Sequence, residues 1–142
     1  VRTVAAEAVA RSAVRAKPFE MGVTDSGCFP PRGSVRIVWA GMHDPSGSLL
    51  ECVNAVEEEM EGIGFPRESR PFSPHITIGR AREGRSSDGV RSAVEGVKMK
   101  RVGQLVNELT LMSSVLSPKG PSYSVVSRAR LGAAANPPSG RY

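Results

Sequence analysis

Three side chains of types suited to phosphate chemistry lie close together in the sequence: His75, Thr77 and Arg80. Imidazole carries protons near neutral pH, a hydroxyl donates a hydrogen bond to an oxyanion, and a guanidinium fork binds phosphate oxygens. Residues two apart on a strand share a face, so we expect His75 and Thr77 to project together, about 7 Å apart. Strict alternation turns Arg80 away, but Gly79 permits a bulge or strand end that brings the guanidinium back. The spacing indicates phosphoryl chemistry, with a structural histidine as the alternative.

The rest of the chain offers few further groups for histidine or metal chemistry. Its other histidine, His43, precedes Asp44-Pro45 at a predicted strand end. The acidic residues between Glu57 and Glu61 are expected on the outer face of a helix, because nothing nearby supplies further ligands for a metal. We therefore expect no metal site.

Basic residues flank His75 on both sides, and the chain carries a net charge of +5. This balance favours a polyanionic partner, and the basic cluster predicts a rim that attracts an RNA terminus. A solvated loop with incidental charge stays equally open, since Glu68 and Glu83 dilute the cluster. The cluster consists of Arg67, Arg70, Arg80, Arg82 and Arg85.

Length and composition indicate one globular domain. The chain has 142 residues, of which 39% are hydrophobic. No charged start followed by a hydrophobic stretch indicates a signal peptide in these residues, and no apolar run approaches the roughly 18 residues needed to cross a bilayer. We therefore expect a cytoplasmic protein with no membrane partner. Cys28 and Cys52 lack metal-finger spacing and are expected to be reduced, half-buried hydrophobic residues.

Hydrophobic periodicity predicts an alternation of helices and strands. The helices are expected over Arg2–Ala16, from a capping box at Ser48 and Glu51 to Gly62 or Gly64, and from a cap at Ser86 or Ser87 to Lys98, Lys100 and Arg101. The strands are expected over Phe19–Thr24, Val35–Met42, Pro74–Arg80, Leu105–Leu116 and Ser122–Leu131. This order predicts an α+β fold with a largely antiparallel sheet. The domain would span residues 1–131, followed by a disordered tail over residues 132–142.

The segment RPFSPHITIGR, from Arg70 to Arg80, resembles the second signature of the 2H phosphoesterase superfamily. The specific likeness is to its LigT-like branch, known as 2′-5′ RNA ligases or RNA 2′,3′-cyclic phosphodiesterases. Gly27–Pro30 with Val35–Gly41 is similar to the strand pair before that family's helix, and Leu111–Tyr123 to its closing hairpin. The resemblance covers residues 17 to 131.

The resemblance implies a bilobal fold whose central cleft receives one His-x-Thr/Ser motif from each lobe, with no metal and no nucleotide cofactor. In that family one histidine is the general base on a water that attacks the cyclic phosphate, and the other protonates the departing ribose oxygen, which leaves a 2′-phosphate. Carried over, His75 is one proton carrier, with the base as its favoured role, and Thr77 and Arg80 bind phosphate. Phe72 would help to stack a base, with packing as the alternative.

The chain departs from the family pattern because the first His-x-Thr motif is absent, and His43-Asp44-Pro45 does not match it. The first residue is Val1 and not Met. Both facts predict an N-terminally truncated copy with an incomplete first lobe, which would be monomeric at full length. The implied function is hydrolysis of 2′,3′-cyclic phosphate ends on RNA or nucleosides, with reversible 2′-5′ ligation. The alternative is a non-catalytic half-site that binds RNA or nucleotide phosphate.

Overall fold

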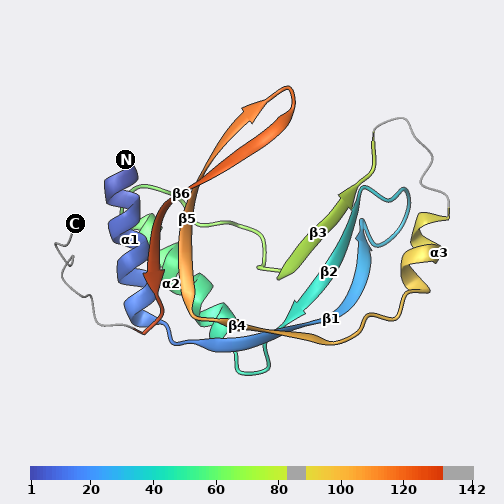
Figure 1. Ribbon diagram of the computed structural model, residues 1–142, viewed down its shortest axis with the longest axis horizontal. Helices are drawn as coiled ribbons and strands as arrows, with labels where there is room; N and C mark the ends of the chain where they lie inside the picture. The colour runs from blue at the N-terminus through green and yellow to red at the C-terminus, as the bar shows by residue number, and fades with distance from the viewer. Residues whose placement is uncertain (83–88, 133–142) are drawn as a thin grey trace. The chain divides into compact units, whose positions relative to one another are not determined.

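The computed structural model of the protein describes residues 1–82 and 89–132. Helices and strands follow one another along the chain in a mixed order (Figure 1). The helices are α1 (Arg2–Arg15), α2 (Ser48–Glu61) and α3 (Val90–Glu95), and the strands are β1 (Phe19–Phe29), β2 (Ile37–His43), β3 (His75–Arg80), β4 (Val102–Val106), β5 (Glu108–Ser117) and β6 (Gly120–Arg130). The predicted α+β class is confirmed.

The chain divides into two compact units. The helical unit comprises Val1–Phe19, Ser46–Pro71 and Leu105–Tyr142. The sheet unit comprises Glu20–Pro45 and Phe72–Gln104. The tail predicted over residues 132–142 falls outside the described residues, apart from residue 132.

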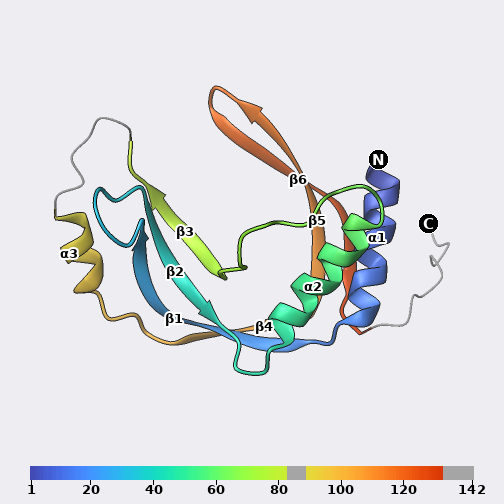
Figure 2. The same cartoon turned by 180° about the vertical axis from the view of Figure 1, so that it is seen from behind.

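Helices α1 and α2 pack side by side in the helical unit, and α1 also contacts β5 and β6 (Figure 2). The buried side of α1 is lined by small side chains, among them Ala5, Ala8 and Ala13, which let the neighbouring elements approach closely. Ser12 is fully buried, and its hydroxyl lies 2.8 Å from the Ala8 carbonyl oxygen and 3.4 Å from that of Ala55 on α2. The alanine-rich sequence thus forms both the predicted helix and its contact surface.

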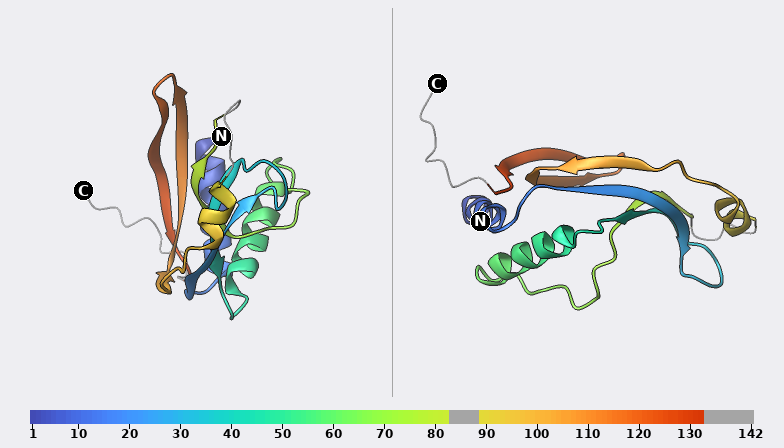
Figure 3. Two further views of the ribbon diagram at one scale, coloured as in Figure 1. Left: turned by 90° about the vertical axis from the view of Figure 1, so that its right-hand side faces the viewer. Right: turned by 90° about the horizontal axis from the view of Figure 1, so that it is seen from below.

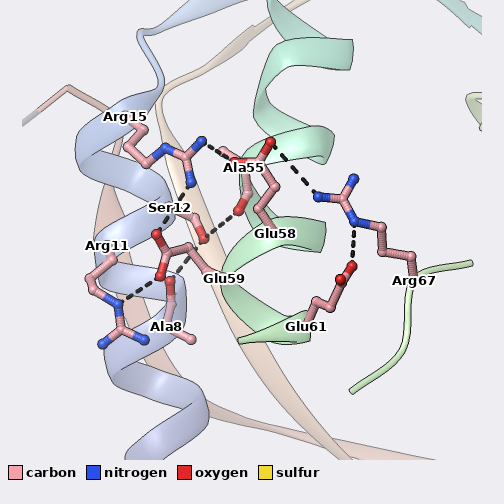
Figure 4. Close-up of polar contacts among 9 residues, drawn as sticks. All are labelled: Ala8, Arg11, Ser12, Arg15, Ala55, Glu58, Glu59, Glu61 and Arg67. Atoms are coloured by element: carbon pink, nitrogen blue, oxygen red, sulfur yellow. Dashed lines mark hydrogen bonds and ion pairs between the residues drawn. The ribbon is translucent and has the colours of Figure 1, made fainter. Parts of the chain in front are cut away.

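The acidic residues Glu58 and Glu59 of α2 face α1 (Figure 4). Arg11 donates a hydrogen bond to Glu59 at 2.7 Å, and Arg15 forms ion pairs with both glutamates. Of the residues expected on the outer face of α2, Glu58 and Glu61 are exposed, whereas Glu59 keeps only 21% of its side chain exposed, so the expectation was wrong for Glu59. The sequence of α2 shows the carboxylates, but only tertiary packing shows that α1 supplies cations opposite them.

Helix α2 begins differently from the predicted capping box of Ser48 and Glu51. Its N-cap is Gly47, which adopts the left-handed conformation at φ 78° and has no side chain with which to cap. Ser46 Oγ accepts a hydrogen bond from the Ser48 backbone N–H at 3.2 Å. The box was wrong because Ser48 already lies in the first helical turn, one residue past the N-cap. The predicted end at Gly62 is confirmed.

Strands β5 and β6 form a long twisted hairpin (Figure 3). They pair antiparallel from Glu108 and Arg130 to Ser117 and Gly120. The single strand predicted over Leu105–Leu116 was wrong, because the structure has two strands there: β4, which joins the four-stranded sheet, and β5. No turn signal separates them in the sequence, so a periodicity argument merges them.

The sheet unit is built on a four-stranded sheet in the order β3-β2-β1-β4. The pairs β1 with β2 and β2 with β3 are antiparallel, as predicted. Strand β1 continues to Phe29, well beyond the predicted end at Thr24. The residues from Asp25 to Gly27 have a turn-like composition, but their pairing with β2 overrides this local preference.

Helix α3 is shorter than the predicted one and begins after Gly89 as its N-cap. The predicted caps, Ser86 and Ser87, lie outside the described residues. Because the helix ends at Glu95, the basic residues after it do not close a helix, which corrects the prediction. These residues are Lys98, Lys100 and Arg101. Arg101 instead directly precedes β4.

Both cysteines are free thiols, with Cys28 in the sheet unit and Cys52 in the helical unit. The prediction of unbridged thiols is confirmed, although both residues are buried and not half-buried. Burial raises the pKa of the Cys52 thiol. Within residues 1–82 and 89–132, every helix is too short or too polar to cross a membrane.

The ion pairs between α1 and α2 predict a pH-dependent part of the stability. Hydrogen bonds from Arg15 and Arg11 hold the pKa of the Glu58 and Glu59 carboxyls, respectively, below its ordinary value. Such a carboxylate stabilises the folded state above its unfolded pKa of about 4.3 and loses that contribution as the pH falls through its folded pKa. We expect Arg15→Gln to lower the melting temperature near neutral pH, with a difference from wild type that shrinks toward about pH 3.

Thermal denaturation followed by circular dichroism over this pH range measures the difference. Arg2→Gln is the matched control, because this α1 arginine donates a hydrogen bond to the neutral hydroxyl of Ser113 at 3.3 Å. Its effect should not follow carboxylate protonation. A destabilisation by Arg15→Gln that stays constant with pH would contradict the assigned ion pairs.

Candidate functional site

A β-bulge interrupts the pairing of β3 with β2 in the middle of the predicted motif. Thr77 pairs with Trp39, and Gly79 pairs with Val38, so Ile78 is the extra residue on β3. The glycine next to the bulge was the signal that the sequence offered, and the extra residue lies one position before it. A bulge shifts the alternation of every side chain that follows it.

The bulge brings Arg80 to the face that carries Thr77. Arg80 pairs with Ile37, and Thr77 pairs with Trp39, which lies two residues further along β2. Cross-strand partners share a face, and so do residues two apart on a regular strand. His75 lies on this face by alternation from Thr77. The three predicted side chains therefore project from one side of the sheet, which we call the site face.

Phe29 at the end of β1 contacts the His75 ring on the site face. Phe29 pairs with Ile37 and so shares this face. Its ring meets the His75 imidazole edge-on, with centroids 5.4 Å apart and an interplanar angle of 84°. Phe29 also packs against Trp39, with centroids 5.3 Å apart. The imidazole is exposed to solvent, yet an aromatic contact restricts its orientation.

Two glycines make room for the Trp39 indole over the site face. A Cβ at Gly27, the β1 partner of Trp39, would lie 2.8 Å from the indole atoms Cε2 and Cη2. A Cβ at Gly41 would lie 3.2 Å from the indole Cζ3. Trp39 is partly buried, and among the described residues its buried Nε1–H has no hydrogen-bond partner. The indole therefore fills the space above the two glycines and serves as a packing residue of the site face.

A carboxylate, Asp25, lies in the same row across the sheet as His75. Gly41 pairs with Asp25 of β1 on one side and with His75 of β3 on the other. The Asp25 Cγ lies 2.9 Å from the place of a Cβ on Gly41, so the carboxylate covers this glycine. Sequence reasoning missed Asp25 and Phe29 because the predicted strand ended at Thr24. Continued alternation back from Phe29 would have placed both on one face.

The backbone holds the His75 imidazole in one tautomer. Its Nδ1 lies 2.7 Å from the carbonyl oxygen of Ser73. A carbonyl oxygen only accepts hydrogen bonds, so Nδ1 carries the hydrogen of the neutral ring. Nε2 then keeps its lone pair, which is the form that a general base requires.

The predicted stacking residue, Phe72, lies in a loop, and the arginines of the predicted basic rim are divided between the two units. Phe72 lies in the loop before β3 with 48% of its surface exposed. Arg67 forms ion pairs with Glu58 and Glu61 of α2 in the helical unit (Figure 4), so its charge is compensated there. Arg70 also belongs to the helical unit, Arg80 and Arg82 belong to the sheet unit, and Arg85 lies outside the described residues.

The described residues contain no group of three or more His, Cys, Asp or Glu side chains that would hold a metal ion. The groups on the site face instead combine a proton acceptor, a hydroxyl donor and a guanidinium on one edge strand. The hydroxyl and the guanidinium can bind phosphate oxygens, and the imidazole can move a proton to or from a group beside the phosphate, without a change in the backbone.

The chain resembles known proteins over most of its length. The sequence profile of the 2′-5′ RNA ligase superfamily matches residues 2–116. The RNA 2′,3′-cyclic phosphodiesterase of Archaeoglobus fulgidus is 34% identical over 79% of this chain and 62% of its own length. That of Aeropyrum pernix is 30% identical over 87% of this chain and 71% of its own. Escherichia coli LigT, solved with 3′-AMP, is 25% identical with a TM-score of 0.64, over 91% of this chain and 67% of its own.

The antiparallel sheet with its His-x-Thr strand and flanking helices is the fold of LigT-like 2H phosphoesterases. The chain belongs to the 2′-5′ RNA ligase superfamily. It spans 62% to 64% of the length of the phosphodiesterases of Archaeoglobus fulgidus, Methanothermobacter thermautotrophicus and Methanocaldococcus jannaschii.

The close approach of Trp39 to Gly27 predicts that even one methyl group there disturbs the site face. We expect Gly27→Ala to displace the indole and to destabilise the fold by about 1–3 kcal/mol. Trp39 is the single tryptophan of the chain, so its fluorescence reports the displacement directly.

Gly79→Ala is the matched control, because a Cβ at this glycine of the same sheet has no neighbouring atom within 4 Å. Chemical denaturation followed by tryptophan emission compares the two variants. Equal stabilities and unchanged spectra for both would show that the indole does not need the space at Gly27.

The Ser73 carbonyl predicts the tautomer of His75. At mildly alkaline pH, where imidazoles are neutral, the ring should carry its hydrogen on Nδ1. Nitrogen-15 chemical shifts of the two ring nitrogens distinguish the tautomers, and His75→Gln assigns the signals by their loss. A predominance of the Nε2–H form would contradict the hydrogen bond to Ser73 and remove the free lone pair from the proposed base.

Proposed function

We propose that the protein is an RNA 2′,3′-cyclic phosphodiesterase that hydrolyses 2′,3′-cyclic phosphate ends to 2′-phosphates and that reversibly ligates such ends to 5′-hydroxyls through 2′-5′ linkages. The observation that supports this most directly is the common face of His75, Thr77 and Arg80, which depends on the bulge at Ile78. A phosphate placed over this face would meet an imidazole, a hydroxyl and a guanidinium at once.

The chemistry assigns a separate role to each group. His75 Nε2 accepts a proton from a water whose oxygen attacks phosphorus, while Thr77 and Arg80 hold the phosphate oxygens and stabilise the negative charge that develops on them. A P–O bond forms to the water, and the P–O3′ bond breaks. The ribose O3′ must then take up a proton, which the family resemblance assigns to a second His-x-Thr motif. Ligation follows the same course with a ribose 5′-hydroxyl in place of water. The 5′-oxygen attacks phosphorus, the P–O3′ bond breaks, and a 2′-5′ phosphodiester remains, so the reverse of this step cleaves a 2′-5′ linkage and restores the cyclic phosphate.

The relatives and the charge support the same substrate class. The relatives from Archaeoglobus fulgidus and Aeropyrum pernix are named RNA 2′,3′-cyclic phosphodiesterases. Escherichia coli LigT has been solved with 3′-AMP, with NADP+ and with ATP, which all contain a nucleotide phosphate. The net charge of +5 favours the approach of a polyanion such as an RNA end.

A second candidate function is a non-catalytic half-site that binds a nucleotide phosphate. The observation that favours it is the lack of a second His-x-Thr motif among the 142 residues, since His43 is followed by Asp44-Pro45. When one of two proton carriers is missing, the rate of the reaction falls by roughly a factor of 10²–10⁴. Such a chain would keep the affinity for product and lose turnover.

Substitutions at Arg80 and His75 test both candidates. Arg80→Ala should weaken the binding of adenosine 2′-monophosphate by roughly tenfold or more, because a charge-assisted hydrogen bond to phosphate is lost. His75→Ala should keep most of this affinity and reduce the hydrolysis of adenosine 2′,3′-cyclic phosphate by about 10²–10⁴. Calorimetric titration and product chromatography measure the two quantities.

Lys98→Ala is the matched control, since it removes an exposed cation of the sheet unit that lies outside the motif and outside the basic cluster around it. Binding with turnover that depends on His75 supports the enzyme, and binding without turnover supports the half-site. If Arg80→Ala and Lys98→Ala change affinity equally, phosphate recognition by the motif is wrong.

A further inference from the structure

A pocket of about 260 Å³ opens in the sheet unit at the far end of β2 from Ile37. We propose that this pocket receives the nucleobase of the nucleotide whose phosphate lies over His75, Thr77 and Arg80. The inference rests on the proposed function and adds a base subsite to it. The pocket volume lies just under the lower limit of about 300 Å³ for whole small-molecule sites, so it suits one part of a nucleotide.

The pocket lies beside the site face and within reach of the phosphate groups. His43, which lines the pocket, is two residues beyond Gly41 on β2, and Gly41 pairs with His75. By alternation His43 lies on the site face, about 7 Å along the strand from the row of His75. Gly22, another lining residue, pairs with His43 and shares this face. A ribose would bridge this separation between phosphate and base.

The charges at the pocket favour a neutral, amphoteric ligand over a second phosphate. The lining includes the cation Arg101 and the anion Glu20, and neither forms an ion pair with another residue of the described chain. A phosphate would be attracted by one of these groups and repelled by the other. A nucleobase edge carries both hydrogen-bond donors and acceptors and can satisfy the guanidinium and the carboxylate together.

The remaining lining supplies the surface that a base needs. Met21, Val102 and Pro45 contribute apolar groups for the flat faces of a heterocycle, and Thr24 contributes a hydroxyl. The Asp25 carboxylate, which covers Gly41 in the row of His75, lies on the site face one row before His43 and can accept a hydrogen bond from a ribose hydroxyl. The sequence of groups along the sheet therefore matches phosphate, sugar and base.

The two histidines of the chain act as separate reporters of the two subsites, because His75 lies at the phosphate groups and His43 at the pocket. The experiment titrates the full chain with inorganic phosphate and, separately, with adenosine 2′-monophosphate, while NMR follows both imidazoles. We expect phosphate to shift the His75 signals alone and the nucleotide to shift both sets. Substitution of each histidine by Gln assigns the signals.

The possible outcomes separate this inference from the proposed function. If the nucleotide shifts His75 and leaves His43 unchanged, the base subsite is wrong and the phosphate site stands. If inorganic phosphate shifts His43, the pocket is an anion site and the base assignment is overturned. If neither ligand shifts His75, the proposed function itself fails.

Two variants test the pocket by affinity. Gly22→Leu should fill it, since a Cβ there meets only the Val102 carbonyl oxygen at an ordinary 3.5 Å. We expect this variant and Arg101→Ala to weaken binding of adenosine 2′-monophosphate by about tenfold without changing the affinity for inorganic phosphate. Lys98→Ala, which removes a cation outside the pocket lining, is the control for Arg101→Ala. Equal loss of both affinities would contradict a role limited to the base.

Discussion

One extra residue in β3 determines which side chains share the site face. Because side chains alternate along a strand, a regular β3 would project His75 and Thr77 to one face and Arg80 to the other. The bulge at Ile78 moves Arg80 into register with Ile37 and so onto the site face. An edge strand can accommodate the extra residue, because only one of its sides is held by a neighbour.

The site face is shaped by aromatic packing as well as by register. Phe29 contacts both His75 and Trp39, and the indole occupies the space that Gly27 and Gly41 leave free. The imidazole is therefore constrained by two independent contacts, the ring of Phe29 and the carbonyl of Ser73. Such preorganisation matters for proton transfer, since a base that is already oriented needs no reorganisation when substrate binds.

The sequence was sufficient to predict local elements, but it was insufficient to predict features that depend on contacts between distant segments of the chain. A helix over Arg2–Ala16 and the His75 strand follow from periodicity, and Gly79 indicates the place for a bulge or strand end. The true length of β1 does not, because the residues after Thr24 favour a turn until β2 pairs with them. The orientation of Glu58 and Glu59 also depends on cations that only α1 brings close. Pattern arguments assign elements, while contacts between distant segments decide which side chains meet.

The distribution of charge along the site face also has a direction. Arg80 lies in the row of Phe29 and Ile37, and Asp25 lies in the row of His75. The face is thus cationic at one end and anionic toward the other. Under the proposed function, a phosphate over His75 would be attracted by Arg80 and repelled by Asp25. This direction of charge would orient a nucleotide with its phosphate toward Arg80 and its uncharged part toward Asp25 and the far end of β2.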